Sequence, residues 1–353
     1  MSGRRWWVVG AAVLAAAALL IGVGLARGWF TPSTPSVADA PRVDVDGVRV
    51  LTEDVELPWG LAFLPDGSAL VTERDSTRLL RVGGDGTVRE VQRVDEARPR
   101  GEGGLLGVAV SPTYEADRWV YVYYSTEDDN RIARMRLGER PTTILTGIPR
   151  AGNHNGGRLA FGPDGMLYAG TGDAADRSTS QDRASLGGKI LRMTPEGEPA
   201  PGNPFPGSVV WSLGHRNVQG LGWDSAGRMY ASEFGQNTYD ELNRIIAGAN
   251  YGWPDVEGTG RDPRFVDPIA TWSPAEASPS GIAVVGDRVY VACLRGARLY
   301  RVGLDGGGAQ ALLQGAYGRL RAVAAAPDGS LWVLTSNKDK LGTPDRILRI
   351  PPG

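Results

Sequence analysis

The chain has 353 residues and a formal net charge of −2, with 38 Lys and Arg against 40 Asp and Glu. The basic residues are scattered among the acidic ones, so no basic stripe marks a nucleic-acid surface and we expect no nucleic-acid partner. The single cysteine, Cys293, excludes an intrachain disulfide and a zinc or iron–sulfur site built from clustered cysteines.

The N-terminus carries a long apolar segment. Arg4 and Arg5 precede the uncharged run 6–26, and Arg27 ends it. A run of this length can cross a bilayer as a helix, with the paired arginines before it on the cytoplasmic side. We therefore predict an export signal and membrane anchor over 1–27 and a Pro/Ser-rich linker over 28–42. The rest would be extracytoplasmic, either anchored at the cell surface or secreted or periplasmic if the segment is cleaved.

Fifty glycines and 24 prolines punctuate short runs of Val, Leu, Trp and Tyr, which is typical of short strands joined by tight turns. Residues 43–353 contain six copies of one pattern: an apolar strand, a hairpin such as Pro-Asp-Gly, a second apolar strand and a later strand containing Arg. The copies begin at residues 60, 107, 158, 220, 281 and 323.

A four-stranded sheet of this size cannot bury its faces alone, whereas six arranged radially bury one another. We predict an all-β fold, a six-bladed β-propeller preceded by an N-terminal hydrophobic helix. A β-sandwich or solenoid fits the repeat length less well. The alternating stretch 48–59, "VRVLTEDVELPW", is predicted to be the strand that closes the ring by joining the last blade.

Loops before the first strand of each blade carry the candidate chemistry. His154 lies in "GNHNGGRL", where glycines allow close approach of a ligand and the imidazole can serve as a general base, a metal ligand or a structural group. The other histidine, His215, occupies the equivalent place in the next blade, in "SLGHRNVQGLGW". Two histidines at equivalent places favour a shared site on the face where these loops converge.

Two further patterns point to ions. Glu233, Asp240 and Glu241 surround Gly235 in "SEFGQNTYDELNRI", which suits Ca²⁺ or is a solvated acidic turn. Separately, "GRLRAV" places two arginines, at positions 319 and 321, two residues apart at the start of a strand. Side chains at this spacing point to the same side, and paired guanidinium groups bind carboxylates or phosphates, although surface arginines are common.

Taken together, six stretches resemble the glucose/sorbosone dehydrogenase family: "LPWGLAFLPDG", "RGEGGLLGVAVSP", "HNGGRLAFGPDG", "LGHRNVQGLGW", "DELNRIIAGANYGWP" and "RLRAVAAAPDGSLWVLT". The resemblance implies a six-bladed propeller that binds pyrroloquinoline quinone (PQQ) and Ca²⁺. It also implies an exported dehydrogenase that oxidises aldose sugars at C1 to lactones and passes the electrons to an unidentified acceptor.

The resemblance also implies roles for single residues. His154 matches the catalytic base, and Arg216 matches a residue beside the reactive quinone carbonyls. Matches to the family's cofactor, substrate and metal positions are Asn217, Arg319 and Arg321 for PQQ, Glu102, Asn153 and Asp173 for the sugar, and the backbone carbonyls of Gly235 and Gln236 for Ca²⁺.

The chain departs from the glucose-oxidising members at several of these places. Glu102 stands for a glutamine, Asn153 for an aspartate, Ala174 for a glutamine, Leu294 for a PQQ-binding lysine and Gln236 for a proline. Long insertions used for dimer contacts and substrate walls are missing, so we expect a more open pocket and a monomer.

Two alternatives stay open at this point. One is a Ca²⁺-dependent propeller hydrolase of the sugar lactonase kind. The other is a carbohydrate- or ligand-binding propeller that has lost the quinone, which Leu294 would favour. A nicotinamide enzyme is not expected, because no G-x-G-x-x-G follows a strand and opens a helix.

Overall fold

A computed structural model describes residues 43–353. The predicted N-terminal helix and the linker, residues 1–42, lie outside the described part of the chain. Within residues 43–353, no helix is long and apolar enough to cross a membrane.

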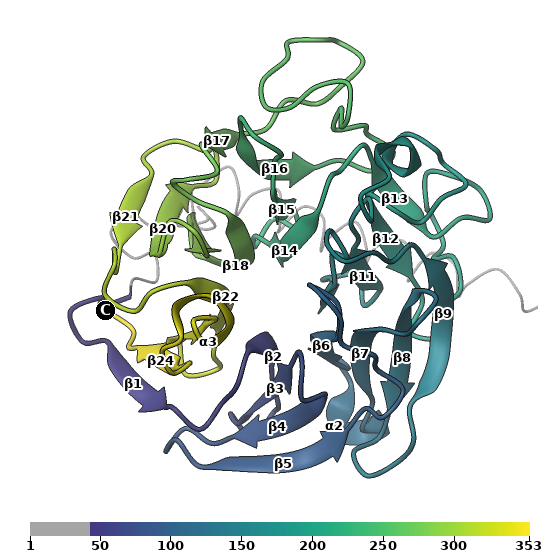
Figure 1. Cartoon of the computed structure of the whole chain (residues 1–353). Coiled ribbons are helices and arrows are strands. Elements are labelled where there is room, and N and C mark those ends of the chain that lie inside the picture. Colours follow the sequence, from purple (N-terminus) through teal and green to yellow (C-terminus); the bar gives the residue numbers. More distant parts are fainter. Residues whose placement is uncertain (1–42) are drawn as a thin grey trace, which may run out of the picture. The chain divides into compact units, whose positions relative to one another are not determined.

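The described chain forms six four-stranded antiparallel sheets arranged as blades around a central channel (Figure 1). The strands are, blade by blade, β2 (Pro58–Phe63), β3 (Ala69–Glu73), β4 (Arg78–Val82) and β5 (Val88–Arg93); β6 (Leu105–Val110), β7 (Val120–Ser125), β8 (Asn130–Met135) and β9 (Thr142–Ile148); β10 (Arg158–Phe161), β11 (Leu167–Gly170), β12 (Lys189–Met193) and β13 (Val210–Leu213); β14 (Val218–Trp223), β15 (Met229–Glu233), β16 (Asp240–Ile245) and β17 (Ala270–Trp272); β18 (Pro279–Val285), β19 (Arg288–Cys293), β20 (Arg298–Gly303) and β21 (Gln310–Leu312); and β22 (Leu320–Ala325), β23 (Leu331–Thr335), β24 (Ile347–Ile350) and β1 (Arg49–Thr52). Short helical turns lie at α2 (Tyr114–Asp117), η2 (Arg177–Ser180) and α3 (Lys338–Leu341).

The six-bladed propeller predicted from the repeat is confirmed. The strand predicted to close the ring is β1, which pairs antiparallel with β24 of the last blade. Figure 1 shows this joint as purple β1 beside yellow β24. Because the first and last strands share a sheet, separating the ends of the chain would break the hydrogen bonds of that blade.

The repeated glycine at the start of the pattern has a packing reason. A Cβ on Gly60 would lie 2.7 Å from the carbonyl oxygen of Leu106, and a Cβ on Gly107 would lie 2.1 Å from that of Gly157. Only glycine therefore lets the first strands of neighbouring blades approach so closely. Side chains between the blades form buried apolar clusters, such as the one that joins Phe63 in edge-to-face contact with Trp332.

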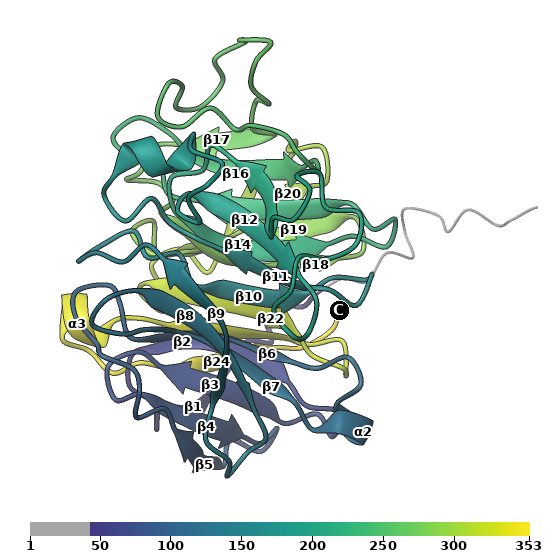
Figure 2. The same ribbon diagram turned by 90° about the vertical axis from the view of Figure 1, so that its right-hand side faces the viewer.

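The propeller has two different faces (Figure 2). One carries the hairpins between the first and second strand of each blade, together with α2 and the C-terminus, and we call it the hairpin face. The opposite face carries α3 and the loops that precede the first strands, and we call it the loop face. Both histidines and the paired arginines precede or begin first strands, so they belong to the loop face.

Candidate active site

His154 lies in the loop that precedes β10 and is partly exposed. Its backbone adopts a left-handed conformation with φ of 54°, and its N–H donates to a carboxylate oxygen of Glu102 at 2.9 Å. Its carbonyl oxygen accepts the N–H of Ala174 at 3.1 Å. The same oxygen packs against Gly172, where a Cβ would lie only 2.0 Å from it. The strained loop is thus held from both sides, and the imidazole keeps 15% of its side-chain surface exposed.

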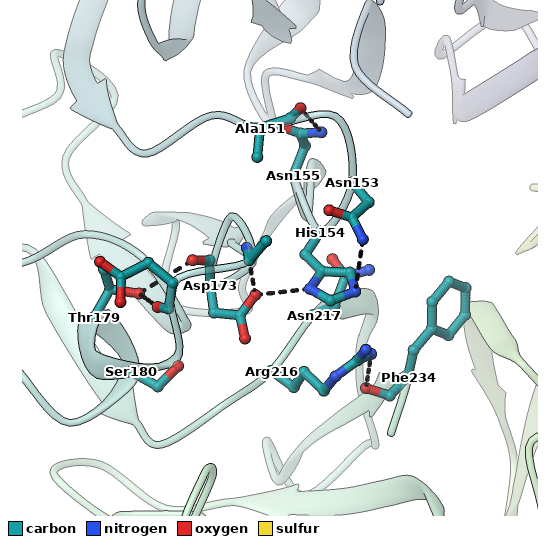
Figure 3. A network of polar contacts seen from close by, with 12 residues as sticks. Ala151, Asn153, His154, Asn155, Asp173, Thr179, Ser180, Arg216, Asn217 and Phe234 are labelled. Carbon is teal, nitrogen blue, oxygen red and sulfur yellow. Dashed lines mark hydrogen bonds and ion pairs between the residues drawn. The ribbon is translucent and has the colours of Figure 1, made fainter. Parts of the chain in front are cut away.

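Asp173 orients the imidazole of His154 (Figure 3). Its Oδ1 lies 2.8 Å from His154 Nδ1 and accepts the N–H of Ala175 at 2.9 Å, while its Oδ2 accepts the indole N–H of Trp253 at 2.8 Å. Burial alone would raise the pKa of Asp173, but the hydrogen bonds from His154 and Trp253 outweigh it and hold the pKa below the usual value. The ionised carboxylate can only accept, so Nδ1 carries the proton and the lone pair of neutral His154 is on Nε2.

Asn153 lies next to that lone pair. Its side-chain nitrogen is 3.3 Å from His154 Nε2, where it can donate a long hydrogen bond. Asn153 is exposed, so a substrate hydroxyl can displace this contact from the loop face. The arrangement of carboxylate, imidazole and open Nε2 is that of a general base oriented by a second group.

Arg216 and Asn217 come from the loop before β14 and meet the same site. The N–H of Arg216 donates to a carboxylate oxygen of Glu233 at 2.8 Å, and its guanidinium donates to the carbonyl of Phe234 at 3.3 Å. The side-chain oxygen of Asn217 accepts the N–H of Gly156 at 3.0 Å, which ties this loop to the His154 loop. Burial lowers the pKa of Arg216.

His215 does not share the site, contrary to what its equivalent position suggested. Its side chain is fully buried and stacks on Tyr251 with ring centroids 4.7 Å apart. Nδ1 lies 2.8 Å from Glu233, and Nε2 lies 2.8 Å from the hydroxyl of Ser212. His215 therefore fixes Glu233, which in turn holds the backbone of Arg216, and it has no route to a substrate.

Beside His154 lies a small polar cavity over the channel. Its lining consists of Trp59, Arg74, Glu102, Asn155, Gly156, Gln219, Phe234 and Arg321. Below it, Trp59 lies between two guanidinium groups, with Arg158 at 4.4 Å and Arg321 at 5.7 Å from its ring centroid. Gln219 bonds both arginines, accepting from Arg158 through its carbonyl at 2.7 Å and from Arg321 through its side chain at 3.2 Å.

These arginines have too few negatively charged partners around the channel. Burial lowers the pKa of Arg321 to about 10, helped by the guanidinium groups of Arg74 and Arg319. Burial also lowers the pKa of Arg158 to about 9, helped by Arg321, and that of Arg319. Lowered arginine pKa values mean that the charged forms are under-solvated, so an anion in the cavity would stabilise them.

The donors present fit a tricarboxylate quinone such as PQQ. Several buried donors at the starts of first strands have no hydrogen-bond partner among the described residues: Nη2 of Arg158, Nε of Arg216, Nδ2 of Asn217 and Nε of Arg321. A buried donor without a partner is costly and rare in a folded protein. An anion with several oxygens meets the need for both charge and acceptors.

The loop 234–239 offers backbone carbonyl oxygens. Glu233, Asp240 and Glu241 belong to strands and are buried among hydrogen-bond partners, so the solvated acidic turn that the sequence left open is wrong. Among residues 43–353, no three His, Cys, Asp or Glu side chains are grouped to hold a metal ion. The carbonyl oxygens of Gly235 and Gln236 accept no hydrogen bond from a described residue, and free carbonyls are ligands that Ca²⁺ takes.

The residues predicted to bind the substrate differ in exposure and in contacts. Glu102 is exposed and lines the cavity, and Asn153 lies at the imidazole. Asp173 is only 1% exposed with both oxygens engaged, so it orients His154 and does not face a sugar. Leu294 is buried and brings no positive charge to the site, and Ala174 adopts a left-handed φ of 49° behind His154.

Two residues of the site escaped the sequence reasoning. Arg74, which follows β3, lines the cavity and forms ion pairs with Asp75 at 2.6 Å and Asp339 at 3.4 Å. Trp253 reaches Asp173 from 80 positions further along the chain. The run "TERD" after the second strand of the first blade was the only signal for Arg74, and no local pattern announces the contact made by Trp253.

Comparison with known proteins identifies relatives along most of the chain. The model of the glucose/sorbosone dehydrogenase family matches residues 55–343. Aldose sugar dehydrogenase of Escherichia coli is 33% identical over 64% of this chain and 63% of its own length, and quinoprotein glucose dehydrogenase B of Acinetobacter calcoaceticus is 32% identical over 64% and 56%. The PQQ-bound aldose sugar dehydrogenase of Streptomyces coelicolor superimposes with a TM-score of 0.83 at 53% identity, covering 87% of this chain and 98% of that one.

Proposed function

This chain belongs to the glucose/sorbosone dehydrogenase family, and we propose that it oxidises aldose sugars at C1 to lactones with PQQ and Ca²⁺ as cofactors. The observation that carries the proposal is the His154–Asp173 pair beside a cavity lined in part by the under-solvated guanidinium of Arg321. Its relatives include a quinoprotein glucose dehydrogenase and a PQQ-bound aldose sugar dehydrogenase, which supports the same chemistry.

In this mechanism, His154 Nε2 takes the proton of the anomeric hydroxyl. Asp173 keeps Nδ1 protonated, which keeps the lone pair on Nε2, and its carboxylate stabilises the imidazolium that forms. Asn153 and Glu102, which contact His154, would bind sugar hydroxyls. Bound PQQ would supply the electrophilic carbonyl carbon that accepts the hydride from C1.

The cofactors would be held by different kinds of groups. Arg319 and Arg321, with Arg74 nearby, would pair with the carboxylates of PQQ, and Arg216 and Asn217 would donate to its quinone oxygens. The carbonyls of Gly235 and Gln236, next to Phe234 of the cavity wall, would bind Ca²⁺, which acts as a Lewis acid on the quinone.

The cellular setting is part of the proposal. The uncharged run 6–26 supports an exported protein held at the membrane, and the missing insertions support a monomer. The described chain enters the propeller at Val43, which bridges to Pro352 near the C-terminus on the hairpin face. The sugar, and an electron acceptor that the sequence does not identify, would bind at the loop face.

A cofactor titration tests the proposal. Purified protein in Ca²⁺ is titrated with PQQ, and absorbance is followed with and without an aldose; we expect saturable binding, a spectral change on adding sugar, and reduction of an artificial dye. His154→Ala should bind PQQ and fail to reduce the dye. Absence of dye reduction across a broad aldose panel would overturn the dehydrogenase, and lactone hydrolysis without PQQ would favour a hydrolase.

A further inference from the structure

A single carboxylate oxygen organises the loop that carries the proposed Ca²⁺ ligands. Glu257, in the long connection between β16 and β17, accepts four consecutive backbone N–H groups on its Oε1. The donors and distances are Gln236 at 2.6 Å, Asn237 at 3.0 Å, Thr238 at 3.1 Å and Tyr239 at 3.2 Å. Successive amides that converge on one anion form a nest, a fixed backbone conformation.

The backbone next to Glu257 is itself held in place. The next residue, Gly258, donates its N–H to buried Glu241 at 2.7 Å. A Cβ on Gly258 would lie 2.4 Å from the ring of Tyr239, so only glycine permits this contact. The nest is therefore anchored to β16 and is not a free surface turn.

The nest sets the direction of the carbonyl groups. In a trans peptide unit the N–H of one residue and the C=O of the preceding residue point in opposite directions. Among residues 43–353, the only cis peptide bond precedes Pro254. The N–H groups of Gln236 and Asn237 point at Glu257, so the carbonyls of Gly235 and Gln236 point away from it.

The neighbouring peptide unit shows the direction in which a carbonyl of this loop points. The N–H of Gly235 donates to Asp240 at 3.0 Å, and the carbonyl at the other end of that unit, on Phe234, accepts from Arg216 at 3.3 Å. The first carbonyl of the row thus faces the arginine of the active site, and its residue lines the cavity. The two carbonyls that follow are turned by Glu257 in the same loop.

We propose that Glu257 is the positioning residue of the Ca²⁺ site: by accepting the amides of residues 236–239, it turns the carbonyls of Gly235 and Gln236 toward the bound ion. The inference rests on the proposed function, which assigns Ca²⁺ to these carbonyls. Glu257 touches neither ion nor substrate and acts through the backbone alone. Removing a group that orients metal ligands typically costs about 10–100-fold in metal affinity.

The test measures the Ca²⁺ concentration that gives half-maximal PQQ binding, by absorbance, without substrate. Glu257→Ala should raise this concentration at least about tenfold, and excess Ca²⁺ should restore the wild-type extent of binding. Glu257→Gln keeps an oxygen acceptor without the charge, so its half-maximal Ca²⁺ concentration should lie between those of wild type and Glu257→Ala. Asp255→Asn, which neutralises an exposed carboxylate two residues away, should behave as wild type.

The outcomes separate the two proposals. If wild-type PQQ binding does not depend on Ca²⁺, both the metal assignment and the role of Glu257 are wrong. If wild type depends on Ca²⁺ and Glu257→Ala has the same half-maximal concentration, only the positioning role is wrong. Should Glu257→Ala fail to fold, Glu257→Asp, which withdraws the oxygen by one methylene, must show the same rightward shift for the inference to stand.

Discussion

Asp173→Asn should separate orientation of the base from binding of the cofactor. Asp173 accepts three N–H groups, from His154 and Ala175 on one oxygen and from Trp253 on the other. An asparagine has one acceptor oxygen and one donor nitrogen in their place. Whichever way the amide turns, one backbone or indole N–H faces an NH₂ group in a site that is buried.

The two orientations have different chemical consequences. With the amide nitrogen toward Trp253, the indole N–H loses its acceptor, at a cost of about 1–3 kcal/mol. With the nitrogen toward His154, the N–H of Ala175 loses its acceptor at a similar cost, and His154 must accept on Nδ1, so its proton moves to Nε2. That tautomer cannot act as the base. Because the costs are similar, both orientations should be populated, and the charge that stabilises the imidazolium is absent from each.

We therefore expect the kcat of Asp173→Asn to fall by about 10²–10⁴-fold, the usual contribution of a positioned general base. PQQ affinity should change by less than about threefold, because Asp173 does not line the cofactor cavity. The assay is single-turnover reduction of bound PQQ by excess aldose. Asp176→Asn is the matched control: Asp176 is exposed in the same loop and caps η2, a role that asparagine performs as well. A kcat within threefold of wild type for Asp173→Asn would refute the assigned orientation.

Three further substitutions follow from the same geometry. Arg321→Met should weaken PQQ binding about 10–100-fold, as loss of a charge-assisted hydrogen bond does. The Tm of the cofactor-free protein should not fall, because the substitution removes an under-solvated charge. A lowered Tm with unchanged PQQ affinity would contradict this. Gly172→Ala would place a Cβ 2.0 Å from the carbonyl of His154, so kcat should fall with little change in the secondary structure seen by circular dichroism, and an unchanged kcat would count against the rigid loop. Burial and the charge of Glu233 raise the pKa of Glu241 to about 8, so the folded state holds this proton more tightly than the unfolded state, and the free energy of unfolding falls as pH rises from about 4.5 to 8. Relative to wild type, Glu241→Gln should therefore gain on the order of 1–3 kcal/mol in free energy of unfolding at pH 8 compared with pH 5. A difference between variant and wild type that does not change with pH in denaturant titrations would refute the shift.

The ring of blades was predictable from sequence because its determinants are local and repeated. Glycine begins four of the six copies and Pro-Asp-Gly forms the hairpin in three of them, and the glycine has a steric reason where it occurs, as the contacts of Gly60 and Gly107 illustrate. The closing strand was predicted from the stretch 48–59, of which only residues 49–52 form β1 and pair with β24, while Pro58 and Trp59 already belong to β2. The repeat pattern was therefore sufficient to predict the fold without knowledge of any single tertiary contact.

The roles of the two histidines were not predictable in the same way. His154 and His215 precede equivalent strands, and both lie in loops that contain glycine and asparagine. What distinguishes them is the partner brought by a distant segment: Asp173 and Trp253 leave Nε2 of His154 open, whereas Tyr251 covers the ring of His215. A repeat pattern places a residue on a face, but only the packing of other blades decides whether its side chain points into the site.

The same limit applies to the loop before β16, whose acidic residues were predicted to belong either to a Ca²⁺ site or to a solvated turn. The solvated turn is wrong, because Asp240 is buried and accepts the backbone N–H of Gly235, while Glu257, from a distant segment, accepts the amides of residues 236–239. A carboxylate that accepts amides turns the attached carbonyls outward. Negative side chains in this loop would thus contribute to the proposed cation site indirectly, by presenting neutral carbonyl oxygens. The cavity wall carries the opposite sign at Arg321, whose guanidinium is under-solvated without an anion. Bringing a cation to the carbonyls and a tricarboxylate to the arginines would relieve both deficits at once, which is why the two cofactors should bind cooperatively.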